Sequence, residues 1–118
     1  MTLDLNIERI NGTVMKSITY EFQITNINKE VLILLGSQDL FYGHNMEILF
    51  KEPHFIESKV NWRVLTDNHV CFKLLGDEDY EFNIRNNILV DYKTVKFRDE
   101  DGKYMYYSFS EMIVEIKL

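Results

Sequence analysis

The chain has 118 residues, a formal net charge of −6 and a hydrophobic fraction of 46%. This length fits one domain, residues 1–118, and the balance of apolar and charged residues excludes a disordered chain. The negative charge disfavours binding to nucleic acid or to anionic membranes, and it is compatible with a basic protein partner.

The first segment predicts a strand followed by a hairpin turn. Leu3, Leu5 and Ile7 alternate with polar residues, which is the period of a half-buried strand. The pair Asn11-Gly12 follows, and it favours a two-residue turn because both positions of that turn need positive φ. We therefore expect residues 3–7 to pair with a second strand over residues 18–24.

The next segment predicts a buried strand and one helical turn. Residues 30–36 are apolar on both faces, which is typical of a central strand. Ser37 can cap a single helical turn over residues 38–42, which Gly43 would end. Residues 46–51 return to extended structure, and Pro53 ends it.

The second half of the chain predicts a succession of antiparallel strands. Alternating apolar residues separated by turn residues begin near residues 60, 70, 80, 88 and 104. Residues 108–118 fit either a helix or a strand, and the strict alternation from Met112 onward favours a strand. The sequence thus predicts an all-β fold, an antiparallel meander of about eight to ten strands arranged as a sandwich or flattened barrel, with at most one or two short helical turns.

Two predicted turns, at residues 77–79 and 99–101, are rich in acids. One turn separates them, so a meander places both at the same end of the sheet. Residues 77–101 contain eight acids and four bases, which is −4 of the total charge. Such turns are often no more than solvated corners. The alternative is a docking surface for a cationic protein partner. The predicted partner-binding residues, with an exposed Tyr107, are Asp77, Glu78, Asp79, Asp99, Glu100, Asp101 and Tyr107.

No residue pattern in the sequence predicts catalysis, a cofactor or a metal. His44 with Glu47 and His54 with Glu57 have a spacing that shares one face of a helix, but in a strand residues three apart point to opposite faces. Cys71 lies in an apolar run and is interpreted as a core residue. We expect a protein that is not an enzyme. A metal-dependent enzyme using His44, Glu47 and His54 is the weakest alternative.

The main alternative function is a small-molecule-binding β-barrel. Its cavity would be lined by the aromatic residues Trp62, Tyr92, Tyr104, Tyr106 and Tyr107, which could instead form a recognition surface. A cavity of several hundred Å3 facing these side chains would favour this hypothesis, whereas a solid core would argue against it.

Two stretches of the sequence carry a resemblance to a known family. Residues 41–48 read FYGHNMEI, and residues 82–88 read FNIRNNI. The first is similar to the Phe-His-Asp-x-Glu-Ile stretch, and the second to the Phe-Asn-x-x-Asn-x-Ile stretch, of bacterial toxin-immunity proteins of the immunity protein 50 type. The resemblance covers about residues 37–118, and it departs from the family at Asn45, where the family usually has Asp.

The resemblance implies a cytoplasmic protein that binds and neutralises a cognate bacterial toxin without catalysis, and the negative charge of the chain predicts that this toxin is basic. It also implies structural roles for four residues, as a buried polar pair and as turn residues: His44, Glu47, Asn83 and Asn86. The first residues lack a basic patch followed by an apolar run, which likewise predicts the cytoplasm. A free sheet edge leaves a homodimer by strand addition open.

Overall fold

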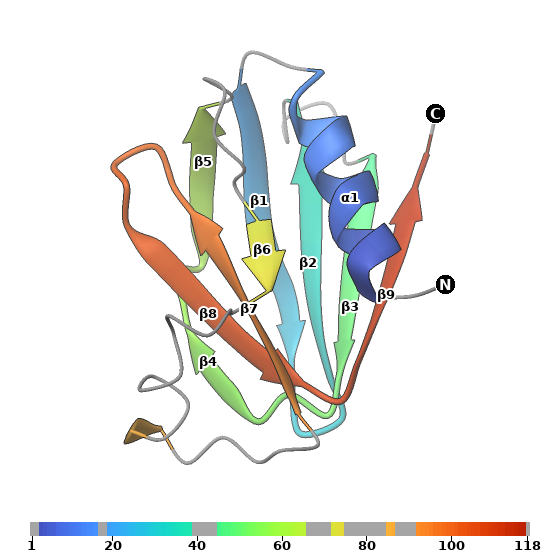
Figure 1. The fold of residues 1–118 in the computed structure, drawn as a ribbon, viewed down its shortest axis with the longest axis vertical. Helices are drawn as coiled ribbons and strands as arrows, with labels where there is room; N and C mark the ends of the chain where they lie inside the picture. The colour runs from blue at the N-terminus through green and yellow to red at the C-terminus, as the bar shows by residue number, and fades with distance from the viewer. Residues whose placement is uncertain are drawn as a thin grey trace.

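Two antiparallel sheets and one helix make up the part of the chain that the computed structural model describes, residues 3–16, 19–38, 45–65, 72–74, 85–86 and 92–117 (Figure 1). In spatial order, the five-stranded sheet contains β5 (Asn61–Leu65), β1 (Thr19–Ile27), β2 (Val31–Ser37), β3 (Met46–Lys51) and β9 (Glu111–Ile116). The four-stranded sheet contains β4 (Phe55–Glu57), β8 (Tyr104–Phe109), β7 (Lys93–Arg98) and β6 (Phe72–Leu74).

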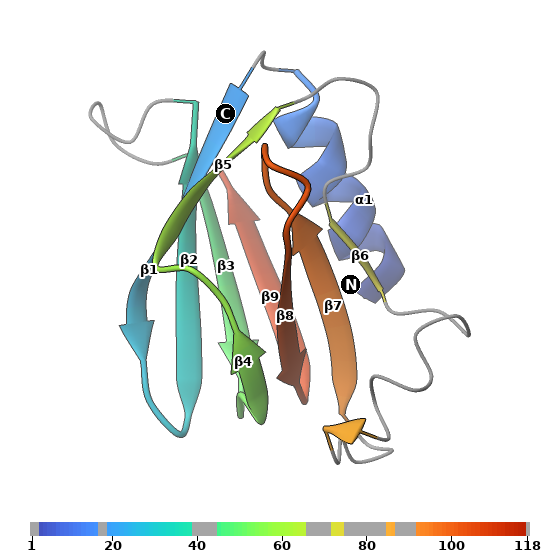
Figure 2. The same cartoon turned by 90° about the vertical axis from the view of Figure 1, so that its left-hand side faces the viewer.

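The predicted all-β, antiparallel class is confirmed, because every strand pair is antiparallel. The central position of β2 and the extended conformation of β9 are also confirmed. Among the described strands, however, a meander exists only within β1–β2–β3 and within β6–β7–β8. The chain passes from one sheet to the other between β3 and β4, between β4 and β5, between β5 and β6 and between β8 and β9, so two facing sheets form in place of one ribbon (Figure 2).

The prediction for the first segment was wrong. Residues Leu3–Val14 form the helix α1, and Asn11-Gly12 lies inside it instead of forming a hairpin turn. Ile10 and Val14 are buried, and Leu3 and Ile7 pack against the same core, which is the three- and four-residue spacing of a helical face. Burial of this face outweighs the unfavourable helix propensity of the glycine. α1 is twelve residues long, and no helix in the described part of the chain could cross a bilayer.

The inner faces of the two sheets form the hydrophobic core. Phe22 and Trp62 from the five-stranded sheet contact Phe97 and Tyr107 from the four-stranded sheet, with ring centroids 5.0 to 6.3 Å apart. Phe50 stacks on Tyr107 with an interplanar angle of 7°. These described rings fill the space between the sheets by packing on one another. They therefore do not support the expectation of an aromatic-lined ligand cavity.

Helix α1 covers the β9 edge of the five-stranded sheet. The Asn6 side-chain amide donates a hydrogen bond to the Met112 carbonyl, at 3.2 Å, and the Arg9 guanidinium donates to the Val114 carbonyl, at 3.3 Å. α1 also contacts β6, the edge strand of the other sheet (Figure 2). The helix therefore closes one open side of the sandwich and satisfies backbone acceptors that an edge strand leaves unpaired.

Candidate functional site

The acidic turn, defined here as residues 99–102, joins β7 to β8. The Asp99 carboxylate accepts hydrogen bonds from the backbone N–H groups of Asp101 and Lys103, both at 2.9 Å. Gly102 has a φ of 80°, a conformation that glycine adopts without a steric penalty. Asp99 and Gly102 fix the shape of the turn. The Asp99 carboxylate accepts hydrogen bonds from the N–H groups of the turn, and Gly102 permits the left-handed backbone conformation.

Asp99 forms an ion pair across 40 residues of sequence with Lys59, with 2.7 Å between Oδ2 and Nζ. Its side chain is only 1% exposed. Burial acts to raise the pKa of Asp99, but the hydrogen bonds from Lys59 and from the two backbone N–H groups outweigh it and hold the pKa below its ordinary value. The hydrogen bond to Asp99 likewise raises the pKa of Lys59. Asp99 is therefore a structural residue, and its predicted place on the partner-binding surface was wrong.

Glu100 and Asp101 are exposed, as the charge pattern predicted. Within the described residues, neither carboxylate has an ion-pair or hydrogen-bond partner. The Glu100 backbone N–H donates to the Arg63 carbonyl, at 2.9 Å, and so attaches the acidic turn to the outer edge of β5. The other predicted acids, Asp77, Glu78 and Asp79, lie outside the described residues.

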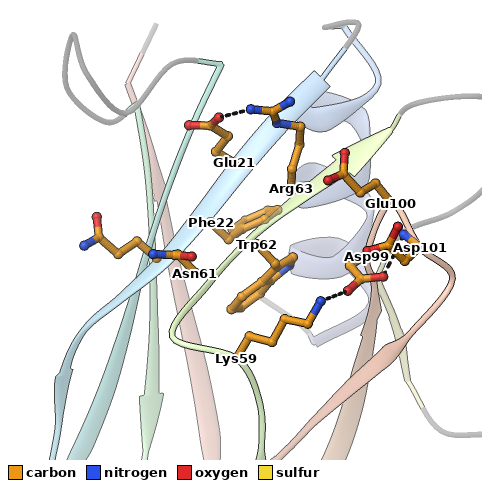
Figure 3. Close-up of a pocket in the computed structure, with 10 residues that line it drawn as sticks. Glu21, Phe22, Lys59, Asn61, Trp62, Arg63, Asp99, Glu100 and Asp101 are labelled. Carbon is orange, nitrogen blue, oxygen red and sulfur yellow. Dashed lines mark hydrogen bonds and ion pairs between the residues drawn. The ribbon is translucent and has the colours of Figure 1, made fainter.

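An open pocket of about 450 Å3 lies between β5 and the acidic turn, and we call it the turn pocket (Figure 3). Side chains from β1, β5, the segment before β5 and the acidic turn surround it. The lining residues are Glu21, Phe22, Gln23, Lys59, Asn61, Trp62, Arg63, Asp99, Glu100 and Asp101.

The turn pocket has an excess of negative charge. Four acidic and two basic residues line it, which leaves a formal charge of −2. Both bases are already paired, Lys59 with Asp99 and Arg63 with Glu21, at 3.0 Å. The unbalanced charge is therefore that of Glu100 and Asp101, and it lies at the exposed side of the pocket, where a cation can approach (Figure 3).

The outer face of the five-stranded sheet, the side turned away from the four-stranded sheet, extends from the turn pocket to β9. A cross-strand row runs over Asn61, Gln23, Leu35, Glu47 and Glu115, and its first two residues also line the pocket. The adjacent row contains Ile33, Leu49 and Ile113, of which Ile113 is 39% exposed. No described helix or strand covers this face (Figure 2).

Tyr107 is buried, and its predicted exposure was wrong. The residue is 1% exposed, and its hydroxyl shares a hydrogen bond with Ser58. Burial raises the pKa of the Tyr107 phenol, and the Ser58 hydrogen bond opposes that shift. Met105, Tyr107 and Phe109 share the inner face of β8, so Tyr104 and Tyr106 are the tyrosines of this strand that point outward. The alternation along the β8 sequence correctly placed Tyr104 and Tyr106 on one face and Tyr107 on the other. It did not show which of these two faces is buried in the core.

Among the residues implied by the resemblance, Glu47 and Asn86 are described and His44 and Asn83 are not. Glu47 is half-buried on the outer face, where its cross-strand neighbour is Glu115. Asn86 lies in a turn and is half-buried. Asn45, directly before β3, accepts a hydrogen bond from the Tyr20 hydroxyl, and its backbone N–H donates to the Gly36 carbonyl. This part of the resembling stretch thus has a structural role.

Of the residues that line the turn pocket, sequence reasoning predicted only Asp99, Glu100 and Asp101 as partner-binding residues. Lys59 lies 40 residues from Asp99, and no local pattern marks the two as a pair. Trp62 was assigned to the aromatic set, yet the sequence gives no sign of whether an indole N–H finds an acceptor. As for metal binding, the described residues contain no group of three His, Cys, Asp or Glu side chains that could hold an ion.

The comparisons with known proteins do not assign the chain to a family. No protein-family model matches the sequence, and no curated protein or solved structure is similar enough to count as a match.

Proposed function

We propose that this protein is a non-enzymatic, immunity-type inhibitor that binds and neutralises a cognate basic toxin in the cytoplasm. The observation that carries the proposal is the pair of exposed carboxylates, Glu100 and Asp101, held beside an open pocket without a cation of their own among the described residues. Unpaired surface charges of one sign speed the association with an oppositely charged protein and disfavour other partners.

The outer face supplies the additional contact area that a protein partner needs. A stable interface buries about 800 Å2 on each partner, which is more than the turn pocket alone provides. The apolar row of Ile33, Leu49 and Ile113 lies next to the row that starts at the pocket. An apolar centre with charged residues around it is the usual arrangement of a protein interface.

The outer face also carries a pair of like charges that a basic partner would stabilise. Glu47 and Glu115 are directly opposite each other on β3 and β9. Neither forms an ion pair with a described residue. Like charges in this position destabilise a sheet by a fraction of a kcal/mol, and a cationic side chain placed between them removes that cost.

The proposal is tested with the toxin encoded beside the gene of this protein. We expect the two purified proteins to form a complex at low salt, to block the toxin's activity, and to associate more slowly as the ionic strength rises. The measurements are analytical size exclusion, stopped-flow association at several salt concentrations, and survival of cells that express both proteins. No complex at low salt, together with unprotected cells, would contradict the proposal.

A double variant tests whether the charge of the acidic turn, and not only its shape, is needed for binding. Glu100→Gln with Asp101→Asn keeps the shape of both side chains and removes their charge, and we expect it to slow association at least tenfold. Glu8→Gln, on the exposed side of α1, is the matched control and is expected to leave association unchanged. Equal slowing by both variants would show that net charge matters and that the acidic turn does not.

A further inference from the structure

Five aliphatic side chains form a continuous band on the outer face of the five-stranded sheet, and we call them the aliphatic band. Val31, Ile33 and Leu35 follow one another along β2, and Leu49 and Ile113 continue the row of Ile33 onto β3 and β9. All five are at least partly exposed, whereas the residues that alternate with them along β2 are buried in the core. No described helix or strand covers the band (Figure 2). A continuous exposed apolar surface of this kind is typical of an interaction site.

The charged residues beside the band on β3 and β9 leave an excess of negative charge. Lys51 pairs with Glu111 at 3.3 Å, so these two charges balance. Glu47 and Glu115 lie directly opposite each other in the row of Leu35. Neither forms a hydrogen bond or an ion pair with a described residue. The face therefore has an unbalanced charge of −2 at the Leu35 end of the band.

This charge distinguishes between two possible occupants, a second copy of the chain and a basic partner. A second copy would bring the same excess of negative charge against the face, and like charges placed together in an interface cost free energy. A basic partner has the opposite effect, because its cationic side chain removes the repulsion between Glu47 and Glu115. The face therefore fits an occupant that is apolar where it meets the band and cationic beside it.

The position and length of the band favour a helix as the occupant. An extended peptide on the face of a sheet would place its N–H and C=O groups against aliphatic side chains, where they lack partners. A helix satisfies these groups internally. From Val31 to Leu35 the band extends about 13 Å, which is the length of about nine helical residues. Its side chains follow one another about 6.7 Å apart along β2, close to the rise of about 6 Å between helical residues i and i+4.

We propose that the aliphatic band binds an amphipathic helix of a basic partner. The helix lies along β2 with its apolar stripe on the band, and an arginine on its flank is bound between the carboxylates of Glu47 and Glu115. Arginine fits better than lysine because its planar fork of donors can contact two carboxylates at once. The arginine belongs on the flank toward β3, because on the β1 side the band meets the uncharged Gln23 and Asn26. This inference rests on the proposed function, since it places the helix in the toxin.

The test uses the full chain and a designed helical peptide of about eighteen residues, long enough to form a helix in water. The peptide consists of alanine and glutamine, with three leucines spaced four and three residues apart as the apolar stripe and two arginines on one flank. We expect it to shift the methyl NMR signals of Ile33, Leu49 and Ile113 saturably. The matched peptide with glutamates in place of the arginines keeps the stripe and reverses the charge, and we expect it to bind at least tenfold more weakly.

A charge variant separates docking from a structural role of the two glutamates. Glu47→Gln with Glu115→Gln is expected to weaken the arginine peptide at least tenfold. It should also raise the melting temperature of the free protein by about 1–4 °C, because the like charges no longer repel each other. A purely structural role would not weaken binding while the fold becomes more stable. The control is Glu8→Gln on the exposed side of α1, which should leave the affinity unchanged.

An apolar variant tests the band itself. Ile113→Thr keeps a β-branched side chain on β9 and makes it polar, and we expect it to weaken the arginine peptide at least threefold. The control is Ile27→Thr, because Ile27 is also exposed on a strand but lies across from a buried residue of β2, on the other side of the sheet. If Ile113→Thr does not fold, the two peptides on the unaltered protein still decide the question.

Two results overturn the inference: methyl signals that do not move with the arginine peptide, or equal binding of the arginine and glutamate peptides. The proposed function fails separately. A toxin complex that forms equally well with the variants of the band would leave the proposed function standing and refute the helix site. Charge-dependent peptide binding without a toxin complex would support the helix site and contradict the toxin as its partner.

Discussion

The two edges of the five-stranded sheet are covered in different ways. At the β9 edge, α1 lays an apolar face on the core and hydrogen-bonds the Met112 and Val114 carbonyls with its side chains. At the β5 edge, the acidic turn provides one backbone hydrogen bond, from Glu100 to Arg63, and leaves an open pocket beside it. One edge is sealed by buried apolar area, and the other is held by a charged turn.

Because of this difference, we expect the β9 edge to contribute mainly to stability and the β5 edge mainly to binding. Apolar burial contributes free energy without a titrating group, and it leaves no polar groups for a partner. The acidic turn depends on one ion pair, in which Asp99 is buried and Lys59 is partly exposed, and it leaves the carboxylates of Glu100 and Asp101 available. We therefore expect variants at the β9 edge to change the free energy of unfolding most, and variants at the exposed acids of the β5 edge to change binding.

The largest expected effect is at the sealed edge. Ile10 is fully buried under α1, and Ile10→Ala leaves a cavity, so we expect a loss of about 2–5 kcal/mol in the free energy of unfolding. Urea denaturation followed by tryptophan fluorescence measures this loss. The control is Leu5→Ala on the same helix, where the side chain is 49% exposed, and the loss there should be much smaller. Equal losses would mean that α1 does not seal the edge.

The second prediction concerns the ion pair behind the acidic turn. Asp99→Asn removes the charge that Lys59 contacts, and we expect a loss of about 1–3 kcal/mol at neutral pH. Asp101→Asn alters an exposed carboxylate and should change stability by less than about 0.5 kcal/mol. Thermal unfolding of both variants gives the comparison. A stable Asp99→Asn protein would show that the turn does not depend on this pair.

The same pair predicts a dependence on pH. The pKa of Asp99 in the folded state lies below its ordinary value of 3.8, so its contribution is present above that value and is lost as the pH falls through the folded-state pKa. Stability of the unaltered protein should therefore fall more steeply than that of Asp99→Asn on acidification below about pH 4. Parallel curves for the two proteins, measured by urea denaturation at several pH values, would contradict this assignment.

A smaller effect is expected for one hydrogen bond at the β9 edge. Asn6→Ala leaves the Met112 carbonyl without its donor from α1, and we expect a loss of about 1 kcal/mol. Glu8→Ala on the exposed side of the same helix is the control. Hydrogen exchange of the β9 amides should rise in Asn6→Ala alone. Unchanged exchange would show that the apolar contacts of α1 suffice to protect this edge.

The smallest effects are expected at two glycines, with opposite signs. A methyl group at Gly12 meets no atom within 4 Å, so Gly12→Ala should stabilise α1 and the sealed edge by about 0.5–1 kcal/mol. Gly102 has positive φ, so Gly102→Ala should strain the acidic turn and destabilise the protein by about 1 kcal/mol. Chemical denaturation of the two variants measures both changes in the free energy of unfolding. If both variants are stabilised, or both destabilised, one of the two backbone assignments is wrong.

Sequence patterns predicted the strands well where each strand has one buried face. The alternation from Met112 to Ile116 identified β9, and the apolar run at residues 31–35 identified the central strand β2. Period alone did not separate a strand from a helix in the first segment, because the spacing of Leu3 and Ile7 fits both, and only the structure shows that Leu5 is exposed. Nor did it show which face of β8 is buried, and Tyr107 was therefore assigned to the wrong side.

The sequence by itself determined the antiparallel strands, the turn at residues 99–102 and the exposed charge of Glu100 and Asp101, because local periodicity and turn chemistry act within a few residues. Only the tertiary structure decided that residues 3–14 form a helix, that Lys59 neutralises Asp99, and that the Trp62 N–H is buried without a partner among the described residues. Each of these depends on contacts between distant parts of the chain. Such contacts are selected by burial in a shared core, which no local pattern contains.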